Sequence, residues 1–357
     1  MALELKFEGK NLVGVDIGTS AVKVIQVRES GKGIHLMKYG VEPLPPQSII
    51  DGHVMNSGVV VDSLNKIFKD LRIPQREVAL SLSGHSVIIK KLNLPLMKQE
   101  ELEEQIQWEA EQHIPYEISE VEIYYNILAE NPDVGQMDVL LVAAKKEEIQ
   151  DLVEVVQQAK LKPGVIDVDA FALQNVYELN YGTTENESIA LLNVGASVST
   201  VNILYGGVSQ FTRDITNGGN AITEEIQKQL QVSFEEAEAY KAGGGIDSQE
   251  VIPGEVDEII SGVVEALAAE IQRSLDFYMA TTNFGEVERV FITGGTSKIP
   301  HLKTAIEQRS KIQVEPFDPF RRVLFDERQF NPEILKSQAP QATICLGLAL
   351  RKQRERI

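Results

Sequence analysis

Two stretches far apart in the chain share one hydrophobic pattern, in which a β-rich run, a glycine turn and a second β-rich run follow each other. The first covers residues 12–27 and the second residues 189–204, and their valine and isoleucine content predicts paired strands. A polar residue, a glycine and a serine recur at the same offsets, as Asp16, Gly18 and Ser20 and as Asn193, Gly195 and Ser197. This echo predicts an α/β protein with two related lobes.

A further α/β unit is predicted between the two copies. We interpret residues 78–82 as its first strand and the acidic stretch 98–113 as a helix that ends before Pro115. Residues 121–127 alternate as a half-buried strand does, and residues 139–144 supply a hairpin partner. The sequence therefore predicts a subdomain at about residues 77–163, inserted into lobe one.

Lobe two continues with helical patterns, and the apolar run 342–350 predicts a helix that returns the chain to lobe one. Lobe one is therefore expected to be discontinuous. We expect it to comprise residues 1–185 and 336–357, and lobe two to comprise residues 186–335. The helices expected in lobe two cover residues 221–231, 234–242 and 257–281.

Composition limits the classes of partner. The 357 residues carry a formal net charge of -19, with a pI of about 4.8. This field repels phosphate backbones and anionic lipids, so we expect neither nucleic acid binding nor direct membrane insertion. No apolar run approaches the length that crosses a bilayer. The single cysteine, Cys345, fits a reducing compartment, and the five scattered histidines do not predict a zinc site.

The two glycine turns are candidate anion sites. A turn without a Cβ at its tip brings backbone N–H groups close to a phosphate. Gly18, Thr19 and Ser20 form one such turn, beside which Lys23 supplies a positive charge and Asp16 can order water on Mg²⁺. The second turn contains Gly195, Ala196 and Ser197. Either turn alone is more often structural than functional, so the prediction depends on the pair.

A third motif follows a buried strand near the end of lobe two. Residues 290–293 are apolar and β-rich, and Gly294, Gly295 and Thr296 come next. We interpret this junction as the start of a helix, whose N-terminus and bare backbone suit ribose and phosphate. A single strand–glycine–helix junction is more often structural, but three such motifs in this order are specific.

Together these motifs resemble the actin-like ATPase superfamily, whose lobes are duplicated RNase H-like units. Residues 16–20 with Lys23 resemble its first phosphate motif, residues 193–197 its second and residues 293–296 its adenosine motif. The resemblance implies ATP or ADP with Mg²⁺, bound in a cleft between the lobes. Residues 234–241 resemble the helix whose side chains flank the purine, which places Glu238 and Lys241 there.

The chain departs from the superfamily at Asn193, where an aspartate usually helps to position metal-bound water. An amide can accept a hydrogen bond but brings no charge and cannot act as a base. The resemblance therefore implies slow hydrolysis, with Asp16 as the metal-side carboxylate. Asp167 or Asp169 could position water, and a purely structural role for them has equal weight.

The predicted insert and the segment 109–115 resemble the PilM family within this superfamily. The resemblance implies a cytoplasmic scaffold of type IV pilus assembly, and hence twitching motility. It would bind the N-terminal cytoplasmic tail of a PilN-like inner-membrane protein, and other pilus components or a second copy are further candidate partners. An FtsA-like division protein is an alternative, but the chain ends in basic residues 351–357 where FtsA carries a membrane helix. A small-molecule kinase is another, although no acceptor pocket or base is recognisable.

One aromatic side chain does not fit the stripe of its predicted helix. Leu102, Ile106 and Ala110 share a face, and Trp108 points away from them. Trp108 could contact a partner. Packing against its own chain is the commoner outcome for a large aromatic residue, and we expect that outcome here.

Overall fold

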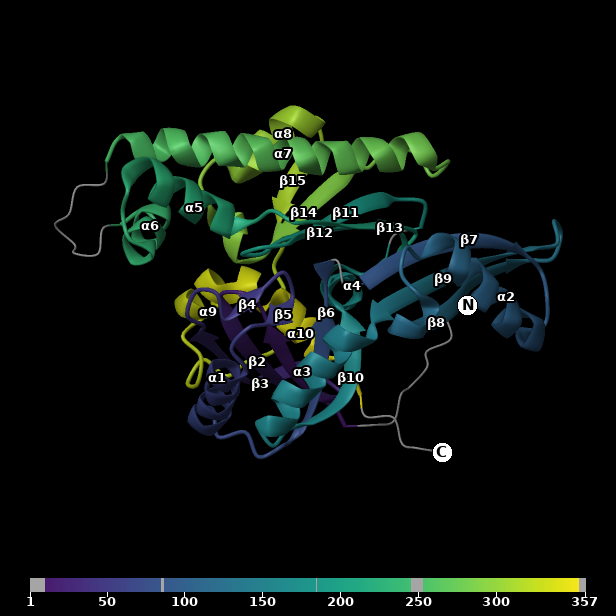
Figure 1. Ribbon diagram of the computed structural model, residues 1–357, viewed down its shortest axis with the longest axis horizontal. Coiled ribbons are helices and arrows are strands. Elements are labelled where there is room, and N and C mark those ends of the chain that lie inside the picture. The colour runs from purple at the N-terminus through teal and green to yellow at the C-terminus, as the bar shows by residue number, and fades with distance from the viewer. Residues whose placement is uncertain (1–9, 85–86, 184, 245–252, 353–357) are drawn as a thin grey trace. The chain divides into compact units, whose positions relative to one another are not determined.

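The computed structural model describes residues 10–84, 87–183, 185–244 and 253–352, and these form two compact units (Figure 1). Unit 1 lies within residues 1–175 and 344–357, and unit 2 within residues 176–343. Among the described residues, no helix is long and apolar enough to cross a membrane.

Unit 1 is built on a five-stranded sheet in the order β10-β6-β1-β2-β3. Strands β1, β2 and β3 pair antiparallel, whereas β6 and β10 run parallel to β1. The helices α1 and α3 share a hydrophobic core with one face of this sheet. The elements are β1 (Val13–Ile17), β2 (Ala21–Ser30), β3 (Gly33–Pro43), β4 (Ile49–Ile50), β5 (His53–Val54), α1 (Ser57–Asp70), β6 (Glu77–Leu82), α3 (Lys146–Gln158), β10 (Lys162–Val168), the first part of α4 (Asp169–Tyr181) and α10 (Thr343–Ala349).

The insert in unit 1 is a separate three-stranded antiparallel sheet in the order β7-β9-β8. One face of this sheet packs on Leu102, Ile106 and Ala110, the predicted stripe of α2. The predicted hairpin of residues 121–127 and 139–144 is present as the β8–β9 pair. The elements are β7 (Val87–Pro95), α2 (Gln99–His113), η2 (Ile118–Glu120), β8 (Val121–Asn131) and β9 (Gln136–Lys145).

The insert is narrower than the predicted 77–163. Strand β6 does not open the insert but lies in the main sheet between β1 and β10. The reason is burial, since Val78, Ala79 and Leu80 are completely buried, as expected for an inner parallel strand covered on both faces. Helix α3 and strand β10 likewise belong to the main sheet and its core. The separate sheet with its helix spans residues 87–145.

Unit 2 contains a second five-stranded sheet, in the order β13-β12-β11-β14-β15. Helix α7 runs along it, and its buried face supplies much of the core (Figure 1). The elements are β11 (Ser188–Val194), β12 (Ser199–Tyr205), β13 (Val208–Ile215), α5 (Gly219–Leu230), α6 (Phe234–Lys241), α7 (Glu255–Thr281), β14 (Arg289–Thr293), η3 (Gly295–Lys298), α8 (Leu302–Ser310), β15 (Gln313–Pro316), α9 (Pro332–Gln338) and η4 (Ala339–Ala342).

The two main sheets have the same topology. In each, an antiparallel three-stranded meander is followed by two strands parallel to its first strand. Strands β1 and β2 correspond to β11 and β12, which are the two halves of the sequence echo. The echo therefore marks a structural duplication.

The units divide after Asn175 and Thr343, whereas the sequence placed the lobe boundaries after 185 and 335. Helix α4 crosses the first boundary without a break, and its second half packs in unit 2, where Asn180 Nδ2 donates to Pro319 O at 2.8 Å. At the second boundary, Thr343 Oγ1 lies 2.7 Å from Thr293 Oγ1 of unit 2. A boundary inside a continuous helix leaves no turn signal in the sequence.

Candidate functional site

The first glycine turn joins β1 to β2 in unit 1. Gly18 N donates to Ala21 O at 3.1 Å, which closes a tight turn with Thr19 and Ser20 at its tip. A Cβ at Gly18 would lie 3.3 Å from Lys23 Nζ and 3.6 Å from Asp16 Oδ1. The turn thus brings the backbone and both charged side chains of the predicted motif together.

Asp16 and Lys23 form an ion pair across the β1–β2 ladder. They are register partners, and Lys23 Nζ donates to Asp16 Oδ2 at 2.8 Å, with each side chain 14% exposed. Burial lowers the pKa of Lys23, but the attraction and hydrogen bond of Asp16 outweigh it, so the pKa is raised above its ordinary value. Lys23 is therefore a fixed cation at neutral pH, held next to a carboxylate.

Asp167 and Asp169 have different surroundings. The Asp167 carboxylate accepts a hydrogen bond from Arg351 Nε at 2.5 Å and is only 6% exposed. Asp169 accepts from Ser81 Oγ and contributes to the electrostatic field at Lys23. Asp167 thus has a structural partner, because its ion pair with Arg351 links the two chain segments of unit 1, and its role in positioning water stays a prediction. Asp169 is thus, besides Asp16, a carboxylate whose charge acts on Lys23.

The second turn, in unit 2, repeats the first with neutral side chains. Gly195 N donates to Val198 O at 3.0 Å, the same bond that Gly18 makes. Asn193 and Thr200 are register partners at the positions of Asp16 and Lys23. Thr200 is 2% exposed and carries no charge. The unit 2 turn therefore offers backbone donors and amide chemistry without a fixed cation.

The start of α5 packs directly on this second turn. Gly219 N donates to Gly195 O at 3.0 Å, and Asn220 N donates to Ala196 O at 2.7 Å. Asn220 Nδ2 also donates to Ser197 Oγ at 3.0 Å. The approach needs glycine, because a Cβ at Gly218 would lie 2.5 Å from Gly195 O.

This contact was not predicted, because the helix was expected to begin at Ala221, whereas α5 begins at Gly219. A signal was available in the sequence. Two adjacent glycines, Gly218 and Gly219, come shortly after a β-rich run, just as Gly294 and Gly295 do in the third motif.

The third motif places its two glycines in different surroundings. Gly294 has φ +91°, and a Cβ there would lie 2.3 Å from Val194 O, whereas Gly295 faces open space. Thr296 Oγ1 donates to Gly195 O at 2.7 Å, so this motif contacts the second turn. The predicted helix does not begin here. Residues 295–298 form a short 3₁₀ turn and α8 begins at Leu302, because Pro300 disfavours a helical conformation in the residue before it.

Glu238 and Lys241 lie on α6 beside the start of α5. Lys241 Nζ donates to Thr223 Oγ1 at 2.7 Å and to Gly219 O at 3.2 Å, and it is ion-paired with Glu238. Thr223 Oγ1 also donates to the Glu238 carboxylate. Through Gly219, this cluster joins the second turn and Thr296. The residues predicted in unit 2 are therefore one connected group.

Each unit, taken by itself, presents groups that suit part of a nucleotide. In unit 1, the Gly18 turn presents backbone next to a protonated lysine, which suits phosphate. In unit 2, a side chain at Gly295 would meet open space. Near the second turn, Asn217 Oδ1 is buried and has no hydrogen-bond partner, so it could accept one from a ligand. No group of three or more metal-ligating side chains occurs in the described ranges. Mg²⁺ that travels with phosphates keeps most of its waters and needs only one or two carboxylates, a role that Asp16 can fill.

Trp108 is more exposed than the expected packing against its own chain would leave it. Its side chain is 55% exposed on α2, opposite the buried stripe. Since Leu102, Ile106 and Ala110 already fill the contact with the sheet, the helix has no second inner face for a large aromatic residue. The alternative, a contact with a partner, therefore remains open for this side chain.

Comparison with known proteins gives relatives over nearly the whole chain. The family model "Type IV pilus assembly protein PilM" matches residues 14–353. A solved structure titled "PilM-PilN type IV pilus biogenesis complex" is 28% identical, with a TM-score of 0.86, and covers 97% of this chain and 99% of that one.

More distant relatives share the fold. The cell division protein FtsA of Bacillus subtilis is 24% identical over 256 residues, which span 64% of this chain and 57% of that protein. MreB 5 of Spiroplasma citri, solved with AMPPNP, is 11% identical with a TM-score of 0.53, and the match covers 95% of each chain. These matches show a two-lobed actin-like fold. Because the family model covers well over half of the chain, this chain belongs to the PilM family of type IV pilus assembly proteins.

Proposed function

We propose that this chain is a nucleotide-binding scaffold of the type IV pilus assembly machine, which holds the cytoplasmic tail of a PilN-like membrane protein. The observation that carries the nucleotide part is the Asp16–Lys23 ion pair at the Gly18 turn. A fixed ammonium group beside the backbone of a glycine turn suits phosphate, and the neighbouring carboxylate suits the hydration shell of Mg²⁺.

The proposed ligand is ATP or ADP with Mg²⁺. In unit 1, the Gly18, Thr19 and Ser20 backbone and Lys23 would contact phosphate, and Asp16 would accept hydrogen bonds from metal-bound water. In unit 2, the Gly195–Ser197 turn would contact phosphate. Gly294, Gly295 and Thr296 would lie beside the nucleoside, with Glu238 and Lys241 at the purine. Bound Mg²⁺ would neutralise phosphate charge during hydrolysis.

Hydrolysis is proposed to be slow. Asn193 occupies in unit 2 the position that Asp16 occupies in unit 1. An amide cannot take a proton from water. Asp167 is ion-paired with Arg351, and Asp169 is the further carboxylate whose charge acts on Lys23. Nucleotide would then act chiefly as a ligand that favours one conformation of the scaffold over another.

The partner proposal comes from the family and from the solved complex, whose title pairs PilM with PilN. A PilN-like tail would hold this chain in the cytoplasm at the inner membrane through protein contacts alone. Other pilus components and a second copy of the chain are further candidate partners, and twitching motility would be the cellular output.

Three measurements test the proposal. Isothermal titration with Mg·ATP should show binding to the wild-type chain, and Asp16→Ala should abolish it; undiminished affinity would contradict the site.

Steady-state ADP release should be very slow and unchanged by sugars or carboxylates, since stimulation by one acceptor would indicate a kinase. Sedimentation with Mg·ATP tests the alternative of an FtsA-like, filament-forming protein. Filaments that sediment would contradict the scaffold proposal.

A further inference from the structure

Helix α2 of the insert has one face in contact with the sheet and one in solvent. Leu102, Ile106 and Ala110 pack in the core of the insert and are at most 1% exposed. Trp108, the only tryptophan of the chain, is on the opposite face and 55% exposed. Exposing so much of a large aromatic side chain sacrifices the burial that usually stabilises a fold, and such residues are enriched in interfaces.

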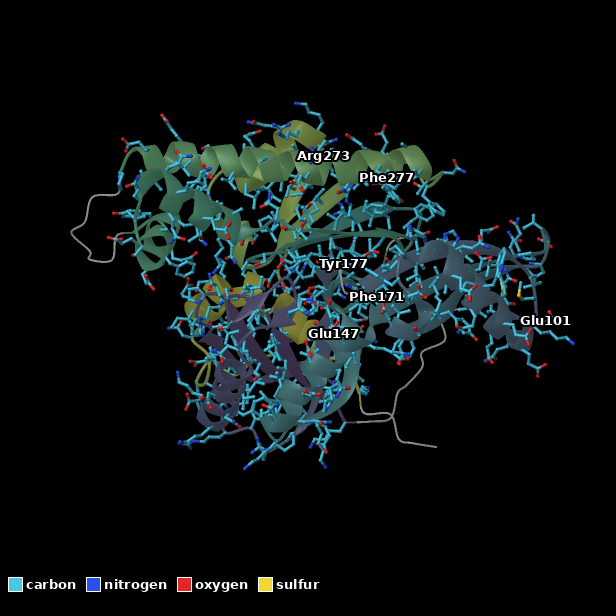
Figure 2. All side chains as sticks on the ribbon, in the orientation of Figure 1. Glu101, Glu147, Phe171, Tyr177, Arg273 and Phe277 are labelled. Carbon is cyan, nitrogen blue, oxygen red and sulfur yellow. The ribbon has the colours of Figure 1, made fainter. Side chains whose placement is uncertain are left out.

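Acidic side chains surround this tryptophan. At helical spacing, Glu101, Glu104 and Glu111 lie seven and four residues before and three residues after Trp108, on the same side of α2. All three are exposed, and Figure 2 labels Glu101 on this helix. No lysine, arginine or histidine occurs from Gln99 to Gln112, and the one histidine of α2, His113, lies 3.4 Å from the Glu109 carboxylate, off this face. Glu101 and Glu104 are three residues apart, and like charges this close on a helix repel each other.

The charge is concentrated in the insert as a whole. Between Val87 and Lys145 the chain has twelve acidic residues against four lysines and no arginine. The Glu103 side chain, by contrast, points away from Trp108, because five residues rotate the helix about 140° beyond one full turn. The face formed by Glu101, Glu104, Trp108 and Glu111, here called the Trp108 face, therefore combines one apolar contact with a negative rim.

We propose that the Trp108 face is a docking surface for a basic, arginine-containing segment of another protein. An arginine guanidinium can stack on the exposed indole and reach a carboxylate of the rim at the same time, which lysine does less well. The rim carboxylates attract the segment and set its register, while the indole supplies most of the binding free energy. Nucleic acid and anionic lipid surfaces are repelled by the same rim.

The test uses the full chain and a short synthetic helical peptide in which arginines recur at i and i+4 around a leucine. Because Trp108 is the only tryptophan, its emission reports contact directly, and binding of labelled peptide is followed in parallel by fluorescence anisotropy. The wild-type chain should bind with a blue-shifted or quenched emission. Trp108→Ala should weaken binding at least tenfold while the unfolding midpoint stays unchanged.

The matched pair of variants is Glu104→Gln and Glu103→Gln. Both remove one exposed carboxylate from α2, but only Glu104 lies on the Trp108 face. We expect Glu104→Gln to weaken binding about threefold and Glu103→Gln to leave it unchanged. Equal weakening by both would show attraction to net charge alone and would overturn the proposal.

Two further outcomes would also reject it. A lysine-for-arginine peptide that binds equally well would remove the stacking contact. A change of oligomeric state in Trp108→Ala, without any loss of peptide binding, would make this face a contact between copies. Neither readout depends on nucleotide or on a PilN-like tail, so the proposal can fail independently of the proposed function.

Discussion

The glycine turns of the two units have the same backbone and different chemistry. Gly18 and Gly195 close equivalent hairpins with bonds of 3.1 and 3.0 Å. The unit 1 turn is flanked by the Asp16–Lys23 ion pair, and the unit 2 turn by neutral Asn193 and Thr200. The unit 2 turn is also covered by the start of α5 and by Gly294. Duplication thus conserved the shape of the turn, while one copy supplies charge and the other is fixed by packing.

The largest expected effect concerns packing in unit 2. Gly294→Ala would place a methyl group against Val194 O in a left-handed conformation, and we expect a loss of about 3 kcal/mol in the free energy of unfolding. Gly295→Ala is the matched control, because a Cβ there meets open space, and it should cost at most about 1 kcal/mol. Urea denaturation followed by circular dichroism measures both. Equal losses would mean that Gly294 is not required by the close approach.

The second prediction concerns variants that give the charged pair of unit 1 the neutral side chains found at the same positions in unit 2. Asp16→Asn and Lys23→Thr each leave a largely buried charge without its partner, and each should cost about 2 kcal/mol of stability. The double variant should lose less than the sum of the two, with a coupling of about 1 kcal/mol. Additive losses in the same denaturation experiment would show that the pair contributes nothing as a pair.

A third prediction restores in unit 2 the carboxylate that unit 1 retains. Asn193→Asp should raise the rate of ADP release from Mg·ATP about tenfold, because a carboxylate can orient and deprotonate water. The same substitution combined with Asp16→Ala, which should not bind nucleotide, controls for contaminating activity. An unchanged rate would show that Asn193 does not limit hydrolysis.

The smallest effect is the pH dependence that two buried groups of unit 1, Lys23 and Cys345, contribute to stability. Burial, with Asp16 nearby, raises the pKa of the Cys345 thiol well above its ordinary 9.0, and the pKa of Lys23 is raised above 10.5. Both groups hold their protons more tightly in the folded state. The contribution of these two groups to stability should therefore be constant below about pH 9 and fall as pH rises further, with Cys345 contributing first.

The slope should not exceed about 1.4 kcal/mol per pH unit for each proton. Cys345→Ala should remove the part of the decline that begins near pH 9.0. Denaturation curves at successive pH values would measure it. If stability still begins to fall near pH 9.0 in this variant, groups other than Cys345 cause that part of the decline.

The sequence alone determined the local features of this protein. The echo of residues 12–27 and 189–204 predicted the duplicated strands and both glycine turns, because β-rich runs and turn residues act over a few positions. The stripe of α2 and the hairpin of the insert were predictable for the same reason. The family resemblance, carried by the same short motifs, was confirmed by the match to residues 14–353.

Tertiary structure decided what depends on residues far apart in the chain. Only packing placed β6 in the main sheet, paired Asp167 with Arg351 and brought Gly218 against the second turn. Only packing left Trp108 in solvent, since periodicity shows that a residue is off the core stripe but not what covers it. These outcomes depend on which surfaces meet when the chain folds, and local hydrophobic patterns carry no information about that choice.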